Sequence, residues 1–274
     1  MENNVFKGHL IRKAIVGGAF AVLAIGAAVA VTIVNAKVIA PNEGFINAYL
    51  CKVESGNAKN NMGDRLAVEI EQEGIVLAKN DDNCLPLSKT TTKINVFGYS
   101  VVEWIHGGSG SGTVYPGSSQ KFWTLLDALD DRGISYSQEI IDYYKSWASP
   151  TARGKGSESY GSDYNTVYRL TNPSLSNNAD YKEVYDQVKG DTDTAIVVLG
   201  RWGGEHLDPP HEQVNNYKSV KSKNTERGYL EITEEEQELL TAVGEDYSKV
   251  IVVINSSHTM QMDFMRDIPG LDAC

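Results

Sequence analysis

A short apolar run followed at once by glycine and polar residues is the feature that most constrains this fold. Residues 196–199 are β-branched or apolar throughout, which is typical of a strand buried on both faces of a parallel sheet. The runs at 94–98 and 250–254 share this pattern. Between these runs, apolar residues recur at the spacing of amphipathic helices. A chain in which strands and helices alternate is typical of an α/β fold. We expect a mostly parallel sheet flanked by helices, an α/β sandwich.

Local signals predict where several helices and minor strands lie. Helices are expected at 65–73, at 122–129 with Gly133 as its left-handed stop, and after Thr233, which has Glu236 at the spacing of a reciprocal N-cap. Short strands are expected at 75–80 and 134–137, and 268–273 is interpreted as the start of another. The chain ends there, so we expect a truncated sheet that is incomplete at its C-terminus.

Two segments lack the pattern of regular structure. Residues 146–178 are rich in Ser, Gly, Asn and Tyr and have little aliphatic periodicity, so a long surface loop is predicted. Residues 107–112 read Gly-Gly-Ser-Gly-Ser-Gly, but no lysine follows and the loop runs on to Pro116. Phosphate-binding loops need a Gly-Lys-Ser/Thr sequence or a glycine motif that opens directly into a helix. A tight turn is therefore favoured over a phosphate site.

The first 36 residues indicate export. Residues 15–34 are uncharged and about as long as a membrane-spanning helix, and Lys7, Arg12 and Lys13 precede them. We expect a cytoplasmic basic segment at 1–13, a transmembrane anchor at 14–36, a tether at 37–61 and an extracellular domain at 62–274. A cleaved signal peptide ending at Val34-Asn35-Ala36 is the alternative, and the domain is then secreted.

Composition excludes several classes of partner and cofactor. The chain has 25 Lys and Arg against 36 Asp and Glu, a net charge of −11, which disfavours binding to nucleic acid. Cys51, Cys84 and Cys274 have no metal-ligand spacing and are interpreted as unpaired. We therefore expect no metal site and no cofactor.

The candidate site follows the strand at 196–199, because ligands of α/β sheets bind beyond the carboxyl ends of the strands. Glu205 is the candidate acid, since the two glycines before it allow a sharp turn. Trp202 is the apolar wall that favours a protonated carboxyl or stacks on a sugar. Arg201, Asp208 and His206 are further candidate substrate-binding residues. Asp208 is equally consistent with a solvated loop position, and for His206 and His211 exposed polar loop positions are favoured. His211 makes no convincing metal pair with His206.

Four segments in order resemble glycoside hydrolase family 3, in the α/β-sandwich domain of β-glucosidases and β-xylosidases. They are EGIVLAKNDDNCLPL at 73–87, INVFG with GGSGSGTV at 94–98 and 107–114, AIVVLGRWGGEHLD at 195–208, and LEITEEEQELLTAV with VIVVIN at 230–243 and 250–255. The match departs from the family at His206, which replaces a glycine, and at Pro209, where arginine is usual.

The resemblance implies a retaining glycosidase in which Glu205 is the general acid/base. It also implies that the nucleophile is an aspartate on a (β/α)8 barrel, a domain missing from this chain, as in a family member whose sandwich domain precedes its barrel. The implied substrate is a β-linked oligosaccharide or aryl glycoside, and the chain is expected to be inactive alone. The alternative is a non-catalytic carbohydrate-binding membrane protein that uses Trp202, Trp104 and the tyrosines of 159–168.

Overall fold

The computed structural model describes residues 62–107, 123–147, 170, 172–204, 208–217, 220–224 and 226–274. The chain divides into two units, Met1–Val76 and Leu77–Cys274. The described part of the first unit is essentially one helix, α3 (Met62–Gly74), which confirms the helix predicted at 65–73. The second unit holds the sheet and its helices, and the rest of this subsection concerns that unit.

Three parallel strands form the centre of the second unit. They are β1 (Asn95–Phe97), β2 (Thr194–Arg201) and β5 (Lys249–Ser256), in the spatial order β1-β2-β5. Ile196 is paired with Val96 on one side and with Ile251 on the other. All eight residues of β2 are buried, as expected for a central strand covered on both faces. The parallel sheet and its three main strands are thus confirmed.

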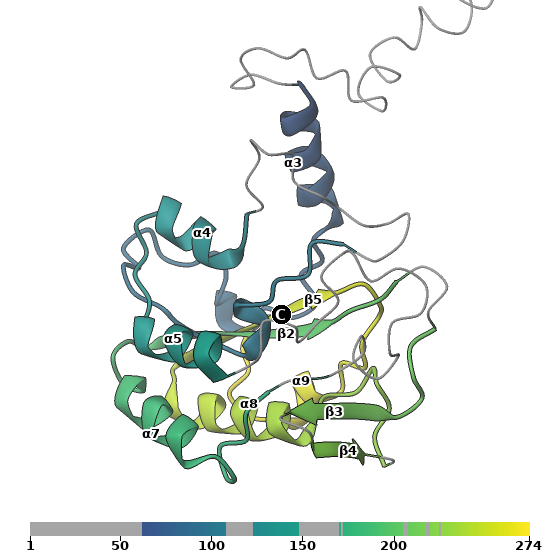
Figure 1. Cartoon of the computed structure of the whole chain (residues 1–274). Helices are drawn as coiled ribbons and strands as arrows, with labels where there is room; N and C mark the ends of the chain where they lie inside the picture. The colour runs from purple at the N-terminus through teal and green to yellow at the C-terminus, as the bar shows by residue number, and fades with distance from the viewer. Residues whose placement is uncertain are drawn as a thin grey trace, which may run out of the picture. The chain divides into compact units, whose positions relative to one another are not determined.

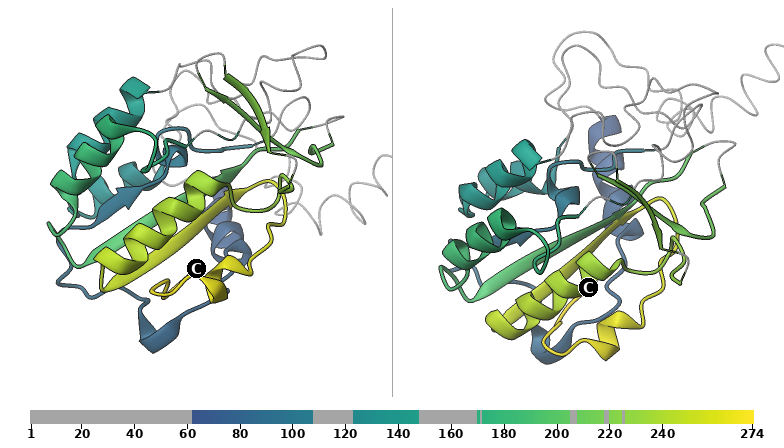
Figure 2. Two further views of the ribbon diagram at one scale, coloured as in Figure 1. Left: turned by 90° about the horizontal axis from the view of Figure 1, so that it is seen from below. Right: turned by 60° about the horizontal axis from the view of Figure 1, so that its bottom comes forward.

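Helices α5 (Gln138–Trp147), α7 (Ala179–Val188) and α8 (Glu234–Asp246) lie side by side along the sheet (Figures 1 and 2). The hydroxyls of Tyr144 on α5 and Tyr181 on α7 are 2.7 Å apart. Tyr185 on α7 donates a hydrogen bond of 2.9 Å to Asp246 on α8. Shorter elements are α4 (Leu125–Asp131), α9 (Phe264–Asp267) and the 3₁₀ turns η4 (Asp81–Asn83) and η5 (Tyr99–Val101).

The helix signals of the sequence correspond closely to the structure. Helix α4 ends as predicted, with Gly133 at φ +67°, and Thr233 and Glu236 form both hydrogen bonds of the predicted capping box of α8. The predicted apolar face of α8 is buried, with Leu239, Leu240 and Val243 at most 2% exposed. The sequence analysis missed α5 and α7, whose buried faces mix tyrosines with aliphatic residues: Ile140, Ile141 and Tyr144 on α5, and Tyr181, Tyr185 and Val188 on α7.

The predicted strand at 75–80 is wrong, because in this segment only Asn80 forms a β-bridge, to Ala273. Among the described residues, the main chain of this segment bonds across the sheet to residues 272–274. Cys274 donates to the Lys79 carbonyl at 3.0 Å, and Ala273 donates to the Val250 carbonyl at 3.1 Å. Residues 272–274 therefore extend the sheet beyond β5, as the sequence indicated, but only as single bridges.

Three other expectations are modified. Residues 134–137 contribute one bridge, between Lys93 and Ser135, rather than a strand. The end of the predicted loop at 146–178 is partly interior, because Leu170 is 1% exposed and Asn172 8%, whereas 148–169 and 171 lie outside the described residues. A hairpin of β3 (Gln213–Tyr217) and β4 (Val220–Asn224) was not anticipated.

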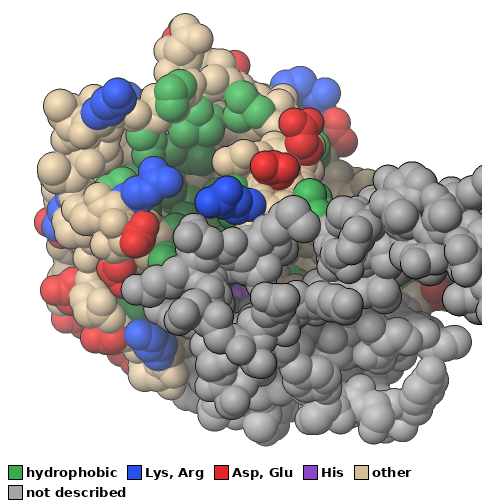
Figure 3. Space-filling view, turned by 90° about the horizontal axis from the view of Figure 1, so that it is seen from above, with side chains coloured by type: hydrophobic (Ala, Val, Ile, Leu, Met, Phe, Trp, Pro, Cys, Tyr) green, Lys and Arg blue, Asp and Glu red, His purple; other side chains and the backbone are tan. Residues whose placement is uncertain are grey.

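The predicted basic segment, anchor and tether at 1–61 lie outside the described residues. Among the helices that the structure describes, none combines the length and the apolar character needed to cross a bilayer. On the face drawn in Figure 3, hydrophobic side chains gather in one area next to charged ones. Leu77 and Trp123 are among the exposed hydrophobic residues of the second unit, at 56% and 58% exposure.

Candidate functional site

Three chain segments meet at the carboxyl edge of the sheet, where ligand sites of α/β folds are found. Asn255, near the end of β5, accepts a hydrogen bond of 2.7 Å from the Ile105 amide and donates one of 3.1 Å to the Ile105 carbonyl. Ser257 donates to the Arg201 carbonyl at 2.9 Å. The segment that leads into the glycine loop, the end of β2 and the end of β5 are therefore fastened to one another.

Arg201, a predicted substrate-binding residue, is fully occupied by the protein itself. Its side chain is 0% exposed. Its guanidinium donates to both carboxylate oxygens of Glu236, at 2.9 and 2.6 Å, and the remaining donors reach the carbonyls of Gly200, Tyr229 and Glu231. A guanidinium has five N–H donors, and all five are used. Arg201 therefore joins the end of β2 to α8 and offers nothing to a substrate.

The partner of Arg201 also caps α8. Glu236 is 1% exposed, accepts a hydrogen bond from the Thr233 amide at 2.9 Å and accepts another from Asn172 at 3.1 Å. Asn172 in turn accepts from the Tyr99 amide at 3.0 Å. Burial by itself lowers the pKa of Arg201, but the charge and hydrogen bonds of Glu236 raise it above its ordinary value. The ion pair is thus fixed within a closed polar network.

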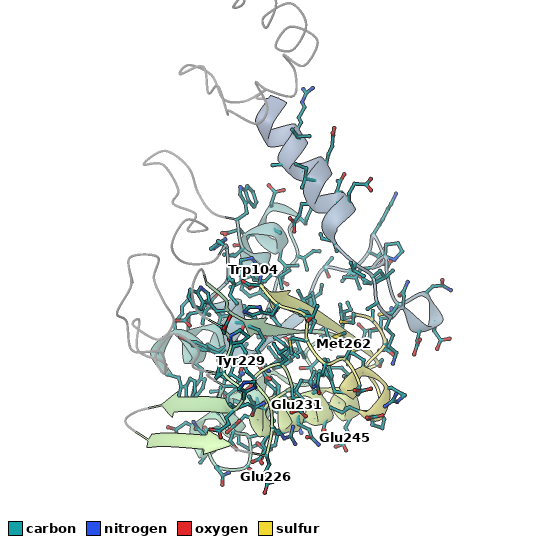
Figure 4. The ribbon with its side chains drawn as sticks, turned by 90° about the vertical axis from the view of Figure 1, so that its right-hand side faces the viewer. Trp104, Glu226, Tyr229, Glu231, Glu245 and Met262 are labelled. Carbon is teal, nitrogen blue, oxygen red and sulfur yellow. The ribbon has the colours of Figure 1, made fainter. Side chains whose placement is uncertain are left out.

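Trp202, predicted as an apolar wall, is 6% exposed and packs in a small cluster with Leu170 and Tyr229. The Tyr229 hydroxyl accepts from the Trp202 amide at 3.1 Å and donates to its carbonyl at 3.0 Å. Figure 4 shows Tyr229 between the sheet and the β3–β4 hairpin. The indole therefore supports the loop from beneath and presents almost no face for stacking on a sugar.

The loop after Trp202 carries the candidate acid. Gly203 and Gly204 lie directly beyond the end of β2, whereas Glu205 and His206 lie outside the described residues. Asp208 is exposed, which is compatible both with substrate binding and with a solvated loop position. The structure thus places Gly203 beside the end of β5, and the position of Glu205 stays a prediction.

Two residues were missed by the sequence analysis, one near the end of β5 and one in the loop that follows it. Asn255 forms the clamp on Ile105 described above. The His258 ring lies against Gly203, where a Cβ would come within 2.2 Å of its Nε2 atom. The polar run Asn255-Ser256-Ser257-His258 directly after a buried strand was the available signal, since it has the same form as the signal used at β2.

The described residues give no support to metal chemistry. No group of three or more His, Cys, Asp or Glu side chains among them is arranged to hold an ion. Cys84 and Cys274 are both free thiols, and burial raises the pKa of each. Cys51 and His206 lie outside this part of the chain.

Residues 75–273 match the model of the glycosyl hydrolase family 3 C-terminal domain. The chain belongs to this family. The match covers the sheet, its flanking helices and the loop that carries Glu205, and it confirms the resemblance found in the four sequence segments.

Known relatives of this family 3 domain are much longer proteins. The chain is 28% identical to beta-glucosidase A of Butyrivibrio fibrisolvens over 207 residues, which is 69% of this chain and 22% of the relative. It is 26% identical to a beta-glucosidase of Ruminococcus albus, over 73% of this chain and 18% of the relative. The chain therefore spans about a fifth of the curated relatives it matches.

Solved family 3 enzymes share the fold. Beta-glucosidase 3B from Thermotoga neapolitana, solved in complex with glucose, superposes with a TM-score of 0.56 at 23% identity, over 83% of this chain and 28% of that protein. A beta-glucosidase from Paenibacillus barengoltzii gives a TM-score of 0.53 at 22% identity, over 72% of this chain and 19% of that protein. At this identity the likeness concerns the fold of the domain.

Proposed function

We propose that this chain is the acid/base half of a retaining β-glycosidase of the β-glucosidase type. The observation that carries the proposal is the family 3 match over residues 75–273, which includes the Gly-Gly-Glu loop beyond β2. Relatives named beta-glucosidases support the substrate class. The substrate is a β-linked oligosaccharide or an aryl glycoside.

In this proposal Glu205 acts twice. It first donates its proton to the glycosidic oxygen while the bond between that oxygen and the anomeric carbon breaks and a nucleophilic carboxylate forms a glycosyl ester. It then takes a proton from the water that attacks the anomeric carbon and releases the sugar. The two carboxyl groups of a retaining enzyme lie about 5 Å apart, so the nucleophile must be brought close to the loop beyond β2.

The nucleophile comes from a partner domain in this proposal. The chain covers only 22% of beta-glucosidase A, and we propose that a (β/α)8 barrel supplies the second carboxylate. The chain without that barrel is then expected to hydrolyse no glycoside. Robust turnover of an aryl β-glucoside by the purified chain, lost in Glu205→Gln, would contradict the need for a partner.

Reconstitution with a separately produced barrel domain of a family 3 relative tests the assignment. We expect turnover only when both parts are present, and a loss of about 10²- to 10⁴-fold in kcat for Glu205→Gln on cellobiose. The loss is expected to be smaller on a dinitrophenyl glucoside, because its leaving group departs without protonation. Glu245→Gln, an exposed substitution on α8, is the control and keeps full activity. Equal activity of Glu205→Gln and the parent on both substrates rejects the role.

The proposed location is the outer face of a membrane, through the uncharged segment at 15–34. Fractionation of cells that express the whole chain tests this. We expect the chain in the membrane fraction and its domain open to added protease, and removal of residues 1–36 is expected to abolish membrane association. A chain of unchanged length in the soluble cytoplasmic fraction excludes the proposal.

The alternative of a non-catalytic sugar-binding protein has less support. It relied on Trp202 and Trp104 as sugar platforms, but Trp202 is 6% exposed and Trp104 packs against the hydrophobic core. The tyrosines of 159–168 lie outside the described residues.

A further inference from the structure

Strand β5 is accompanied unequally on its two sides. On the inner side, all eight of its residues pair with β2. On the outer side, residues 272–274 accompany only its first half: Ala273 forms a parallel bridge with Ile251 and accepts a hydrogen bond of 2.8 Å from the Val252 amide. Residues 253–256 follow directly, and we call them the open stretch of β5.

Main-chain donors and acceptors of the open stretch point outward. Neighbouring residues of a strand direct their N–H and C=O groups to opposite sides, and Val252 faces outward because its amide bonds to Ala273. Ile254 and Ser256 therefore face outward as well, whereas the residues between them face β2. Among the residues that the structure describes, no main-chain group bonds to the Ile254 amide or carbonyl. This side of β5 can therefore accept a further strand.

The side chains of β5 change their burial at the same point. Residues 250–252 are buried and residues 253–256 are half-buried, whereas β2 is buried over its whole length. Val253 and Ile254 pack against the hydrophobic core but stay partly exposed. The open stretch contains no charged residue and no proline, which are the usual protection of a sheet edge against another strand. Its chemistry fits an uncharged partner strand.

A second main-chain segment bounds the position beside the open stretch. Lys79 and Cys274 exchange main-chain hydrogen bonds of 3.3 and 3.0 Å, so residues 272–274 lie between β5 and Lys79. A strand that continues the line of residues 272–274 then lies between the open stretch and Leu77, whose side chain is 56% exposed. Because the bridge of Ala273 to β5 is parallel, such a strand runs parallel to β5.

We propose that the open stretch of β5 receives one extended segment of the barrel-bearing partner polypeptide, which adds a strand parallel to β5. This inference rests on the proposed function, in which the partner supplies what lies outside the 22% of beta-glucosidase A that this chain covers. The place of the segment follows from continuity with the ladder that residues 272–274 begin. Parallel strands are covered on both faces, so the segment is uncharged and rich in β-branched residues. It fastens the partner to the sheet whose strand β2 leads to Gly203.

Amide hydrogen exchange tests the open stretch in the chain alone. The Val252 amide is bonded to the Ala273 carbonyl and is expected to exchange slowly, whereas the Ile254 amide is expected to exchange fast. Extending the chain after Cys274 by Val-Ile-Val-Val-Ile-Asn, the sequence of residues 250–255, is expected to slow exchange at Ile254 about 10-fold. An extension of equal length made of Gly and Ser is the control. Equal exchange at Ile254 in the two extended chains overturns the proposal, as does an Ile254 amide as slow as that of Val252 in the parent.

The partner is tested with beta-glucosidase A of Butyrivibrio fibrisolvens from which the 207 residues matched by this chain have been removed. Adding this polypeptide is expected to slow exchange at Ile254 about 10-fold and to leave Val252 unchanged. Ile254→Pro, which removes only an outward-facing donor, is expected to weaken binding about 10-fold, and Glu245→Gln is the control that keeps it.

The two readouts separate this inference from the proposed function. Turnover in the mixture with unchanged exchange at Ile254 overturns the added strand and leaves the proposed function in place. Slowed exchange without turnover means that the strand stands and the proposed function fails. If the mixture shows neither turnover nor slowed exchange, both are overturned.

Discussion

Arg201 and His258 lie near the ends of neighbouring strands, yet the protein uses them differently. Every donor of Arg201 is bonded to Glu236 or to a main-chain carbonyl. The Nε2 atom of His258 is also buried but has no hydrogen-bond partner among the residues that the structure describes. The end of β2 is covered by the N-terminus of α8 and the turn at 229–231, whereas the ring of His258, two residues beyond β5, faces Gly203. Whether a buried polar residue at a strand end finds hydrogen-bond partners therefore depends on what covers it.

The largest effect is expected at the buried Arg201–Glu236 ion pair. Glu236→Gln leaves the Arg201 charge buried without a counter-charge, so we expect a loss of about 3–5 kcal/mol in the free energy of unfolding, measured by urea denaturation. The double substitution Arg201→Met/Glu236→Met is expected to recover much of that loss.

The matched control is Asp186→Asn, which removes the exposed Lys182–Asp186 pair on α7. Exposed pairs contribute little, so its unfolding curve should overlay that of the parent. If Glu236→Gln is as stable as Asp186→Asn, the Arg201–Glu236 pair is not buried away from solvent.

The buried hydrogen bond between Asn95 and Tyr247 predicts a loss of stability at alkaline pH, of intermediate size. Asn95 donates to the Tyr247 hydroxyl at 2.8 Å, and burial raises the pKa of Tyr247 to about 12. The unfolded tyrosine titrates near pH 10, so its contribution is complete below pH 10 and is lost as the pH rises through 12. The loss amounts to about 3 kcal/mol at most.

Tyr247→Phe should therefore lose less stability than the parent between pH 10 and pH 12, although it starts lower because the bond to Asn95 is gone. Urea denaturation at a series of pH values measures both slopes. Parallel slopes for the two proteins indicate that Tyr247 does not titrate with unfolding.

The smallest effect is expected where Gly203 packs against the His258 ring. Gly203→Ala places a methyl group against the His258 ring, and we expect a loss of about 1 kcal/mol, since overpacking is costly even where a side chain can move. In the double variant Gly203→Ala/His258→Ala the loss should disappear. A double-mutant cycle measures this coupling, and simple additivity of the two changes argues against contact between the residues.

The sequence predicted those parts of the fold whose signals are local. The apolar runs of β1, β2 and β5, the Thr233–Glu236 capping box and the stop at Gly133 depend on residues a few positions apart. Helices α5 and α7 were missed because tyrosines stand beside aliphatic residues on their buried faces and weaken the aliphatic pattern. The hydroxyls of Tyr144 and Tyr181 are buried and bond to each other.

The sequence predicted that Arg201 and Trp202 lie at the carboxyl end of β2, as they do, but it did not predict what their side chains contact. Arg201 has the same sequence signal as a ligand-binding residue, and only its distant partner Glu236 reveals its structural role. His258 and Asn255 are about 50 residues from Glu205 along the chain, and their importance arises from the adjacency of β2 and β5. Sequence periodicity contains no information on such pairings.

The bridge between Asn80 and Ala273 has a consequence for how the domain is made. Lys79 also bonds through its Nζ atom to the Met265 carbonyl, a residue 186 positions later. Contacts between such distant residues slow folding, because a long loop must close before any of them is formed. During synthesis, the edge of the sheet next to β5 stays open until residues 272–274 have left the ribosome, so this side of the domain forms later than the β1-β2-β5 core.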